Sequence, residues 1–160
     1  MAQAGAPSKS AESLIQGQAM SATQIYDAKF LTILWNEKTR TIGIDWKETT
    51  AAMKDEDFKA DLTHFAGEVE RRGARGILVD VSRFRHKMDP EVQQWRIKDI
   101  SSRYNAAGVE RFAFLFPEGA QVPPMMNQSS PGEKFTTRAF TNLHQAENWL
   151  SEIGGQSAAD

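Results

Sequence analysis

The sequence predicts one α/β domain built on a mixed β-sheet, and three observations indicate it. Residues 77–81 and 111–116 are near-continuous apolar runs, as in strands that are covered on both faces. Apolar residues recur at helical spacing in the segments on either side of the first run. Two further β-rich runs precede the first helical segment. Because strands that alternate with helices lie parallel, and an initial hairpin adds antiparallel pairing, the sheet is expected to be mixed.

The first predicted elements are an antiparallel hairpin and a long helix. Residues 30–35 are rich in β-forming types, and residues 40–46 alternate apolar and polar side chains after a four-residue turn. The helix begins at the three carboxylates of residues 55–57, where the helix dipole favours negative charge. An apolar stripe follows, and Gly73 predicts the end of the helix.

The second half of the domain continues the alternation. Asp89 followed by Pro90 predicts a helix start, because an N-cap residue precedes a ring that fits the first helical position. This helix is expected to run to about Ala106. The remaining predicted elements are the strand 111–116, the irregular loop 118–132, the strand 136–140, and a last helix that Asn142 caps and Gly154-Gly155 ends.

Composition limits the class of protein. The chain has 160 residues, a formal net charge of −2 and no Cys. A nearly neutral chain has no global preference for nucleic acid, and a chain without Cys forms no disulfide or thiolate site. No segment approaches the roughly 20 apolar residues of a membrane span. We therefore expect a cytoplasmic protein with no integral membrane segment and no nucleic acid partner.

Both ends of the chain are predicted to lie outside the domain. Residues 1–24 are rich in Ala, Ser, Gln and Gly, and they hold too few large apolar side chains to offset their ordering entropy. We expect a flexible N-terminal tail, with docking of the apolar pair Leu14-Ile15 as the alternative. The domain is expected to cover residues 25–153, and residues 154–160 form a C-terminal tail.

Four segments of the chain carry a family resemblance. They are Ile42-Gly-Ile-Asp-Trp46, Gly76-Ile-Leu-Val-Asp-Val-Ser82, Asp89-Pro-Glu-Val-Gln-Gln-Trp95 and Phe140-Thr-Asn-Leu-His-Gln-Ala-Glu-Asn-Trp-Leu150. Together they are similar to the SpoIIAA-like proteins, a branch of the STAS fold that is also called the STAS/SEC14 domain. The resemblance covers residues 25–153. It implies a four- to five-stranded mixed sheet with helices mainly on one face, in a family whose members mostly have no established biochemical function.

The chain departs from this family at one functional position. Anti-anti-sigma factors with the STAS fold carry a phosphorylatable Ser after the central strand, in an Asp-Ser-Ser-Gly run. The matching region here is Lys87-Met-Asp-Pro90, in which no hydroxyl follows Asp89. The resemblance therefore implies a binding or regulatory module without the kinase-controlled switch of those relatives.

A ligand-binding edge is predicted where two loops follow strand ends. Open α/β sheets bind ligands beyond the carboxyl ends of their strands. Cationic side chains beside a helix N-terminus would hold a phosphate, a carboxylate or a lipid headgroup, and adaptable Met side chains would line a pocket. The alternative is a solvated loop without a ligand. The predicted ligand-binding residues are Ser82, Arg83, Arg85, His86, Lys87, Met125 and Met126.

Trp95 is the predicted interface residue. At 100° per residue it points nearly opposite to Ile97, Ile100 and Tyr104 on the same helix. It therefore either packs beneath a neighbouring segment or forms a surface for a protein partner or a homo-oligomer.

Three functions are compatible with the sequence. The leading hypothesis is a non-enzymatic binding module for a protein partner or a small anionic or amphipathic ligand. The first alternative is a SEC14-like carrier of a lipid or other apolar ligand, which requires a cavity between sheet and helix. The second is a small hydrolase or isomerase that uses His86 with Asp80 or Asp89. We predict no catalytic motif, no metal site and no cofactor, because the three His lack metal spacing and no glycine pattern resembles a nucleotide-binding loop.

Overall fold

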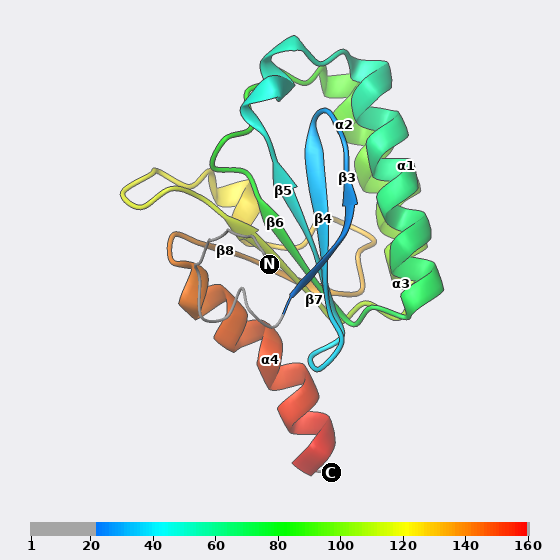
Figure 1. The fold of residues 1–160 in the computed structure, drawn as a ribbon, viewed down its shortest axis with the longest axis vertical. Coiled ribbons are helices and arrows are strands. Elements are labelled where there is room, and N and C mark those ends of the chain that lie inside the picture. The colour runs from blue at the N-terminus through cyan, green and yellow to red at the C-terminus, as the bar shows by residue number, and fades with distance from the viewer. Residues whose placement is uncertain (1–21, 160) are drawn as a thin grey trace, which may run out of the picture.

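The computed structural model describes residues 22–159 and confirms the predicted α/β class with a mixed sheet (Figure 1). Within these residues the sheet has six strands in sequential order. The first three strands pair antiparallel, and the last four pair parallel. The strands are β3 (Thr23–Asp27), β4 (Leu31–Asn36), β5 (Thr41–Trp46), β6 (Gly76–Asp80), β7 (Arg111–Leu115) and β8 (Thr136–Phe140).

The sheet exceeds the predicted four to five strands because of β3. This strand begins at Thr23, inside the segment predicted to be a tail, and pairs with the outer edge of β4 through an irregular register. Its only partly buried residues are Ile25 and Tyr26, so its sequence has no alternation that predicts a strand. The rest of the predicted tail, residues 1–21, lies outside the described residues.

Helices cover the two faces of the sheet unequally (Figure 1). One face carries α1 (Asp55–Arg72), α2 (Pro90–Trp95), η3 (Arg96–Ile100) and α3 (Ser101–Ala107), and the other carries α4 (Leu143–Ala159). The connections include two 3₁₀ turns, η2 (Glu48–Ala52) and η4 (Pro124–Asn127). None of the helices in the described part of the chain is long and apolar enough to cross a membrane.

The local signals for α1 and for the start of α4 are confirmed. α1 begins at Asp55, and Gly73 ends it in the left-handed conformation, with φ of 61°. Asn142 Oδ1 accepts the N–H of Gln145 at 2.9 Å, as an N-cap does. The predicted stop at Gly154-Gly155 is wrong, since α4 continues to Ala159. A glycine ends a helix only by adopting the left-handed conformation, and in helical conformation it merely weakens the helix.

The single helix predicted after Asp89 is interrupted by a π-helical turn. Asp89 occupies the N-cap position and Pro90 the first turn, but the Asp89 side chain makes no capping hydrogen bond. The π-helical segment η3 then separates α2 from α3. A π turn changes the phase of the side chains relative to an α-helix, which a count of 100° per residue does not foresee. Such turns are frequent at functional sites.

Two apolar cores of different size flank the sheet. The large one lies between the sheet and α1 and α3, and it contains the predicted stripe of α1. The small one lies beneath α4 and consists of Ala113, Ala146, Trp149 and Leu150. Neither core fills all the space on its face of the sheet, and one hollow remains on each face.

Candidate functional site

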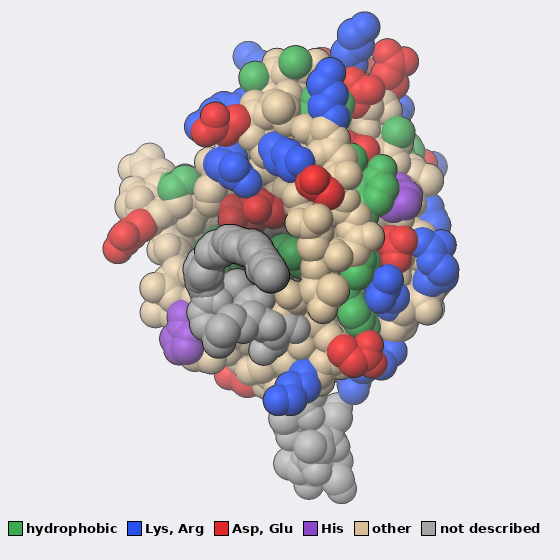
Figure 2. Space-filling model, viewed as in Figure 1, with side chains coloured by type: hydrophobic (Ala, Val, Ile, Leu, Met, Phe, Trp, Pro, Cys, Tyr) green, Lys and Arg blue, Asp and Glu red, His purple; other side chains and the backbone are tan. Residues whose placement is uncertain are grey.

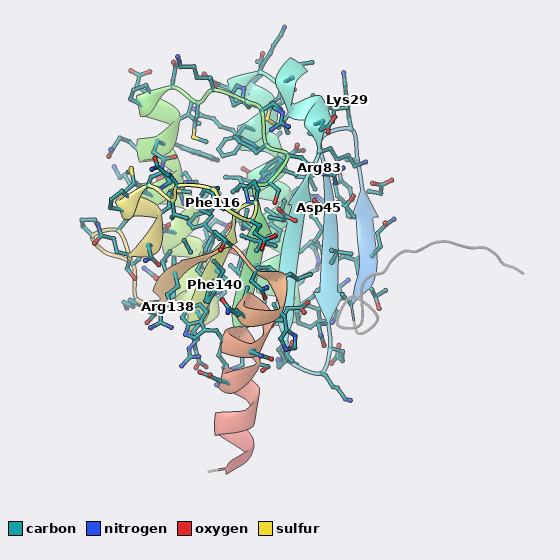
Figure 3. All side chains as sticks on the ribbon, turned by 90° about the vertical axis from the view of Figure 1, so that its left-hand side faces the viewer. Lys29, Asp45, Arg83, Phe116, Arg138 and Phe140 are labelled. Atoms are coloured by element: carbon teal, nitrogen blue, oxygen red, sulfur yellow. The ribbon has the colours of Figure 1, made fainter. Side chains whose placement is uncertain are left out.

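Ion pairs and hydrogen bonds hold the predicted ligand loop to the domain. The Arg83 guanidinium donates to both carboxylate oxygens of Asp45 at 3.2 Å, and Figure 3 shows the two residues one above the other near the ends of the strands. The Ser82 hydroxyl donates to Asp80 Oδ1 at 2.5 Å. Both side chains are therefore engaged within the protein, with carboxylates from the ends of β5 and β6.

His86 pairs with a carboxylate that the sequence did not indicate. Its Nε2 lies 2.8 Å from Asp55 Oδ1, at the first residue of α1, and its side chain is only 9% exposed. The ring also lies near Phe58 and Phe84, with centroids 6.3 and 6.2 Å away. Asp80, one of the two predicted partners, accepts from Ser82 instead. The His86–Asp55 pair fastens the loop to α1 from 31 residues away in sequence.

The remaining predicted ligand residues separate into outer and inner groups. Arg85 and Lys87 are exposed, and neither side chain has an ion-pair partner among residues 22–153. Met125 is also exposed, at 56%. Met126 points inward and packs against the core. The seven predicted residues therefore do not converge on one point, although the two loops that carry them meet above one cavity.

That cavity has a volume of about 290 Å³ and lies between the sheet and the helices. Seven of its fifteen lining residues are aromatic: Trp46, Phe58, Phe84, Tyr104, Phe112, Phe114 and Phe116. Met88 from the loop after β6 and Met126 from η4 complete the wall near the two loops. Figure 3 shows Phe116 directly after β7, at the same end of the sheet as Arg83. The cavity is therefore a mostly apolar space between the sheet and the helices.

Arg96 is the cation in this wall. It lies on the π-helical turn, and its Nε donates to Gln93 Oε1 at 3.3 Å. Desolvation lowers the pKa of the Arg96 guanidinium, against the opposing influence of Tyr104 and Glu133. Glu133 instead accepts from Ser101 Oγ at 2.5 Å and from the Ser130 N–H at 2.7 Å. Among residues 22–153, no carboxylate forms an ion pair with Arg96.

Sequence reasoning missed this site although a signal was present. Phe112, Phe114 and Phe116 follow each other at a spacing of two, so they share one face of a strand and its extension. Three large rings side by side are normal in a core, which is how an apolar run is ordinarily interpreted. Whether they fill the space or leave a cavity depends on α1 and η3, which are distant in sequence. The sequence did not indicate Arg96 either, because its place in the cavity wall also depends on elements that are distant in sequence.

Trp95 lies beside the site on its outer side. The ring is half-buried against the core, with the Lys59 ammonium 5.4 Å from its centroid. It thus packs locally against α1, and its use as an interface stays a prediction.

Fold and site together define a six-stranded α/β domain with an aromatic cavity and one desolvated cation. In the described part of the chain, no group of three His, Asp or Glu could hold a metal ion. No family model, no curated protein and no solved structure matches the chain, and membership of the SpoIIAA-like family stays a prediction.

Proposed function

We propose that this protein is a non-enzymatic binding module for a small amphipathic anion. The apolar body of the ligand occupies the aromatic cavity, and its carboxylate or similar group pairs with Arg96. The observation that carries the proposal is the Arg96 guanidinium, which lies in the cavity wall without an ion-pair partner among the described residues and whose desolvation outweighs the nearby charge of Glu133. A partly buried charge that its surroundings compensate incompletely is unfavourable, and a bound anion would reduce that cost.

The volume of the cavity favours a ligand with one ring or one short chain. About 290 Å³ corresponds to roughly ten water molecules at ~30 Å³ each. This is close to the lower limit for ligand pockets, about 300 Å³. A monocyclic aromatic acid or a medium-chain fatty acid fits such a space, whereas the two acyl chains of a phospholipid are several times larger. Among carriers, the volume therefore favours a SEC14-like role with a smaller cargo than a phospholipid.

The two loops above the cavity support the same ligand chemistry. Met88 and Met126 have flexible thioether side chains, which adapt to different apolar shapes. Arg85 and Lys87 add positive charge on the outside of one loop, and such charge raises the local concentration of anions. Aromatic walls supply affinity, while Arg96 fixes the orientation and selects for an anion.

The experiment compares acids with uncharged analogues. Phenylacetate and octanoate are titrated against phenylacetamide and octanol, with the unfolding midpoint and calorimetric affinity as readouts at neutral pH. We expect both acids to raise the midpoint more than the analogues, because a ligand that binds only the native state stabilises it. Arg96→Met should reduce acid affinity at least tenfold and leave octanol binding intact.

Two further variants make the test specific. Lys98→Met removes an exposed charge from the same helical segment and should leave acid binding unchanged. Met126→Trp adds bulk to the cavity wall and should abolish binding of acids and analogues alike. Equal affinity for acid and amide, or an unchanged acid affinity in Arg96→Met, would overturn the proposal.

A further inference from the structure

The second hollow lies on the opposite face of the sheet, between β4, β5 and β6 and the helix α4. It has a volume of about 400 Å³. Its floor is one row of paired residues, in which Leu34 lies opposite Gly43 and Gly43 opposite Leu78. Gly43 has no side chain to fill the space above the sheet, and a Cβ atom there would lie 3.1 Å from the Leu78 carbonyl oxygen. The centre of the floor therefore has no side chain, and an added Cβ would be tight against the neighbouring strand.

α4 contributes a wall of mixed polarity, in which two Leu residues flank one carboxylate; its lining residues are Leu143, His144, Glu147, Asn148, Leu150 and Ser151. Leu143, Glu147 and Leu150 lie at positions i, i+4 and i+7, so they share the helix face that turns toward the sheet. The Glu147 Oε1 atom is buried and has no hydrogen-bond partner among the described residues. Burial raises the pKa of Glu147 to about 7. A partly buried, unpaired carboxylate is costly unless it takes up a proton or a cation accompanies it.

The upper end of the groove is also acidic. Asp45 and Asp80 lie side by side at the ends of β5 and β6, and both line the groove. Burial, followed by the charge of Asp80, raises the pKa of Asp45. Figure 2 shows acidic side chains recessed in a hollow on this side of the molecule. Within the described residues the lining contains no Lys or Arg, while Arg83 pairs with Asp45 at the rim, and His144 is the other titratable residue of the wall.

We propose that this groove binds an organic cation, an alkylammonium whose chain lies on the Leu34–Leu78 floor and whose ammonium group pairs with Glu147. An inorganic cation does not use the apolar floor, and a neutral alkane leaves the carboxylate unpaired. A primary ammonium on a short chain satisfies both features, because it supplies three N–H donors next to apolar surface. This site is separate from the aromatic cavity, so neither proposal depends on the other.

The test uses the full chain and three ligands with the same chain length: hexylammonium, hexanol and hexanoate. Binding is followed at pH 8 by calorimetry and by NMR shifts of α4 and β5 amides. We expect affinity to fall in the order hexylammonium, hexanol, hexanoate. Glu147→Gln should weaken hexylammonium at least fivefold and leave hexanol unchanged. Glu91→Gln, an exposed change of the same type on α2, is the matched control and should have no effect.

A second variant tests the floor without changing charge. Gly43→Ala places a methyl group in the centre of the groove and should weaken hexylammonium and hexanol to the same extent. Equal binding of hexylammonium and hexanoate, or an unchanged affinity in Glu147→Gln, would overturn the proposal. Binding that is seen only after the double change Leu14→Ser and Ile15→Ser would also overturn it, because the chain's own residues 1–21 would then occupy the groove.

Discussion

Apart from Ile44, which lines both, the cavity and the groove are built from alternate residues of the same strands. In β5, Trp46 lines the cavity, whereas Gly43 and Asp45 line the groove. In β7, Phe114 lines the cavity and Leu115 the groove. Because successive side chains point to opposite faces, a single strand supplies both surfaces without conflict.

The two hollows differ in their number of aromatic side chains and in the sign of their charged residues. The cavity has aromatic walls and one cation, Arg96, whereas the groove has an aliphatic floor and the carboxylates Asp45, Asp80 and Glu147. Each hollow contains a desolvated charge that lacks an ion-pair partner among residues 22–153, and the two charges have opposite sign. One sheet therefore separates two ligand chemistries, and substitutions on one face should not affect binding on the other.

The largest expected effect is a loss of stability, and it compares a residue in the cavity wall with a residue on the groove floor. Phe58 is 3% exposed and stacks on Trp46, with centroids 5.6 Å apart. Phe58→Ala should lower the free energy of unfolding by about 3–4 kcal/mol, whereas Leu34→Ala, on the half-buried groove floor, should cost about 1 kcal/mol. Urea denaturation of both variants measures the difference. Similar costs would mean that the groove floor is as tightly packed as the cavity wall.

The next effect concerns the cation in the cavity. Since desolvation lowers the pKa of Arg96, its charge is less favourable in the folded protein than in water. Arg96→Met should therefore raise the free energy of unfolding of the ligand-free protein by about 1–2 kcal/mol while it removes acid binding. The measurement is the urea midpoint at unchanged m-value. A loss of stability instead would show that Arg96 is a structural residue, held by Gln93.

Local signals predicted much of the fold. The two ends of α1, the hairpin of β4 and β5 and the start of α4 depend on residues a few positions apart, which a sequence displays directly. The short edge strand β3 and the π turn η3 were missed because neither has a distinctive pattern. The sequence indicated the edge of the sheet where the candidate site lies, but it did not indicate the site itself.

The missed part of the site depends on distances between remote residues. Arg83 and His86 are attractive ligand residues until Asp45 and Asp55 are placed beside them, 38 and 31 residues away in sequence. Glu147 resembles any polar residue on a surface helix until the hollow that it lines together with Gly43 is found. Periodicity in the sequence shows which residues lie on the same face of a helix or strand. Only the packing of the folded chain determines whether other side chains fill the space beside that face.

The pH dependence of stability tests the carboxylate in the groove. Burial raises the pKa of Glu147 from 4.5 to about 7, so between these values the folded protein binds more protons than the unfolded chain. Stability from this group is therefore highest below pH 4.5 and is lost as the pH rises through 7. Wild type should lose about 1 kcal/mol relative to Glu147→Gln between pH 5 and pH 8. This is less than the full value of the shift, because the side chain is partly exposed.

The difference between the two proteins isolates Glu147. Asp61, whose pKa burial and Asp57 raise to about 6, is present in both and cancels in the subtraction. Parallel curves of unfolding free energy against pH for wild type and variant would contradict the assignment of a desolvated carboxylate to α4.

The smallest expected effect concerns the ion pair between Arg83 and Asp45 at the rim of the groove. Arg83 and Asp45 are both accessible to solvent, and an exposed ion pair contributes about 0.5 kcal/mol or less. Arg83→Met should therefore barely change the unfolding midpoint. It should, however, strengthen hexylammonium binding about twofold, because Asp45 loses its counter-ion and the groove becomes more negative. Acid binding in the cavity should not change, since the salt bridge lies on the groove side of the sheet. An equal change in both affinities would show that the two faces are coupled through the loop after β6, and the separation of the two sites would then be wrong.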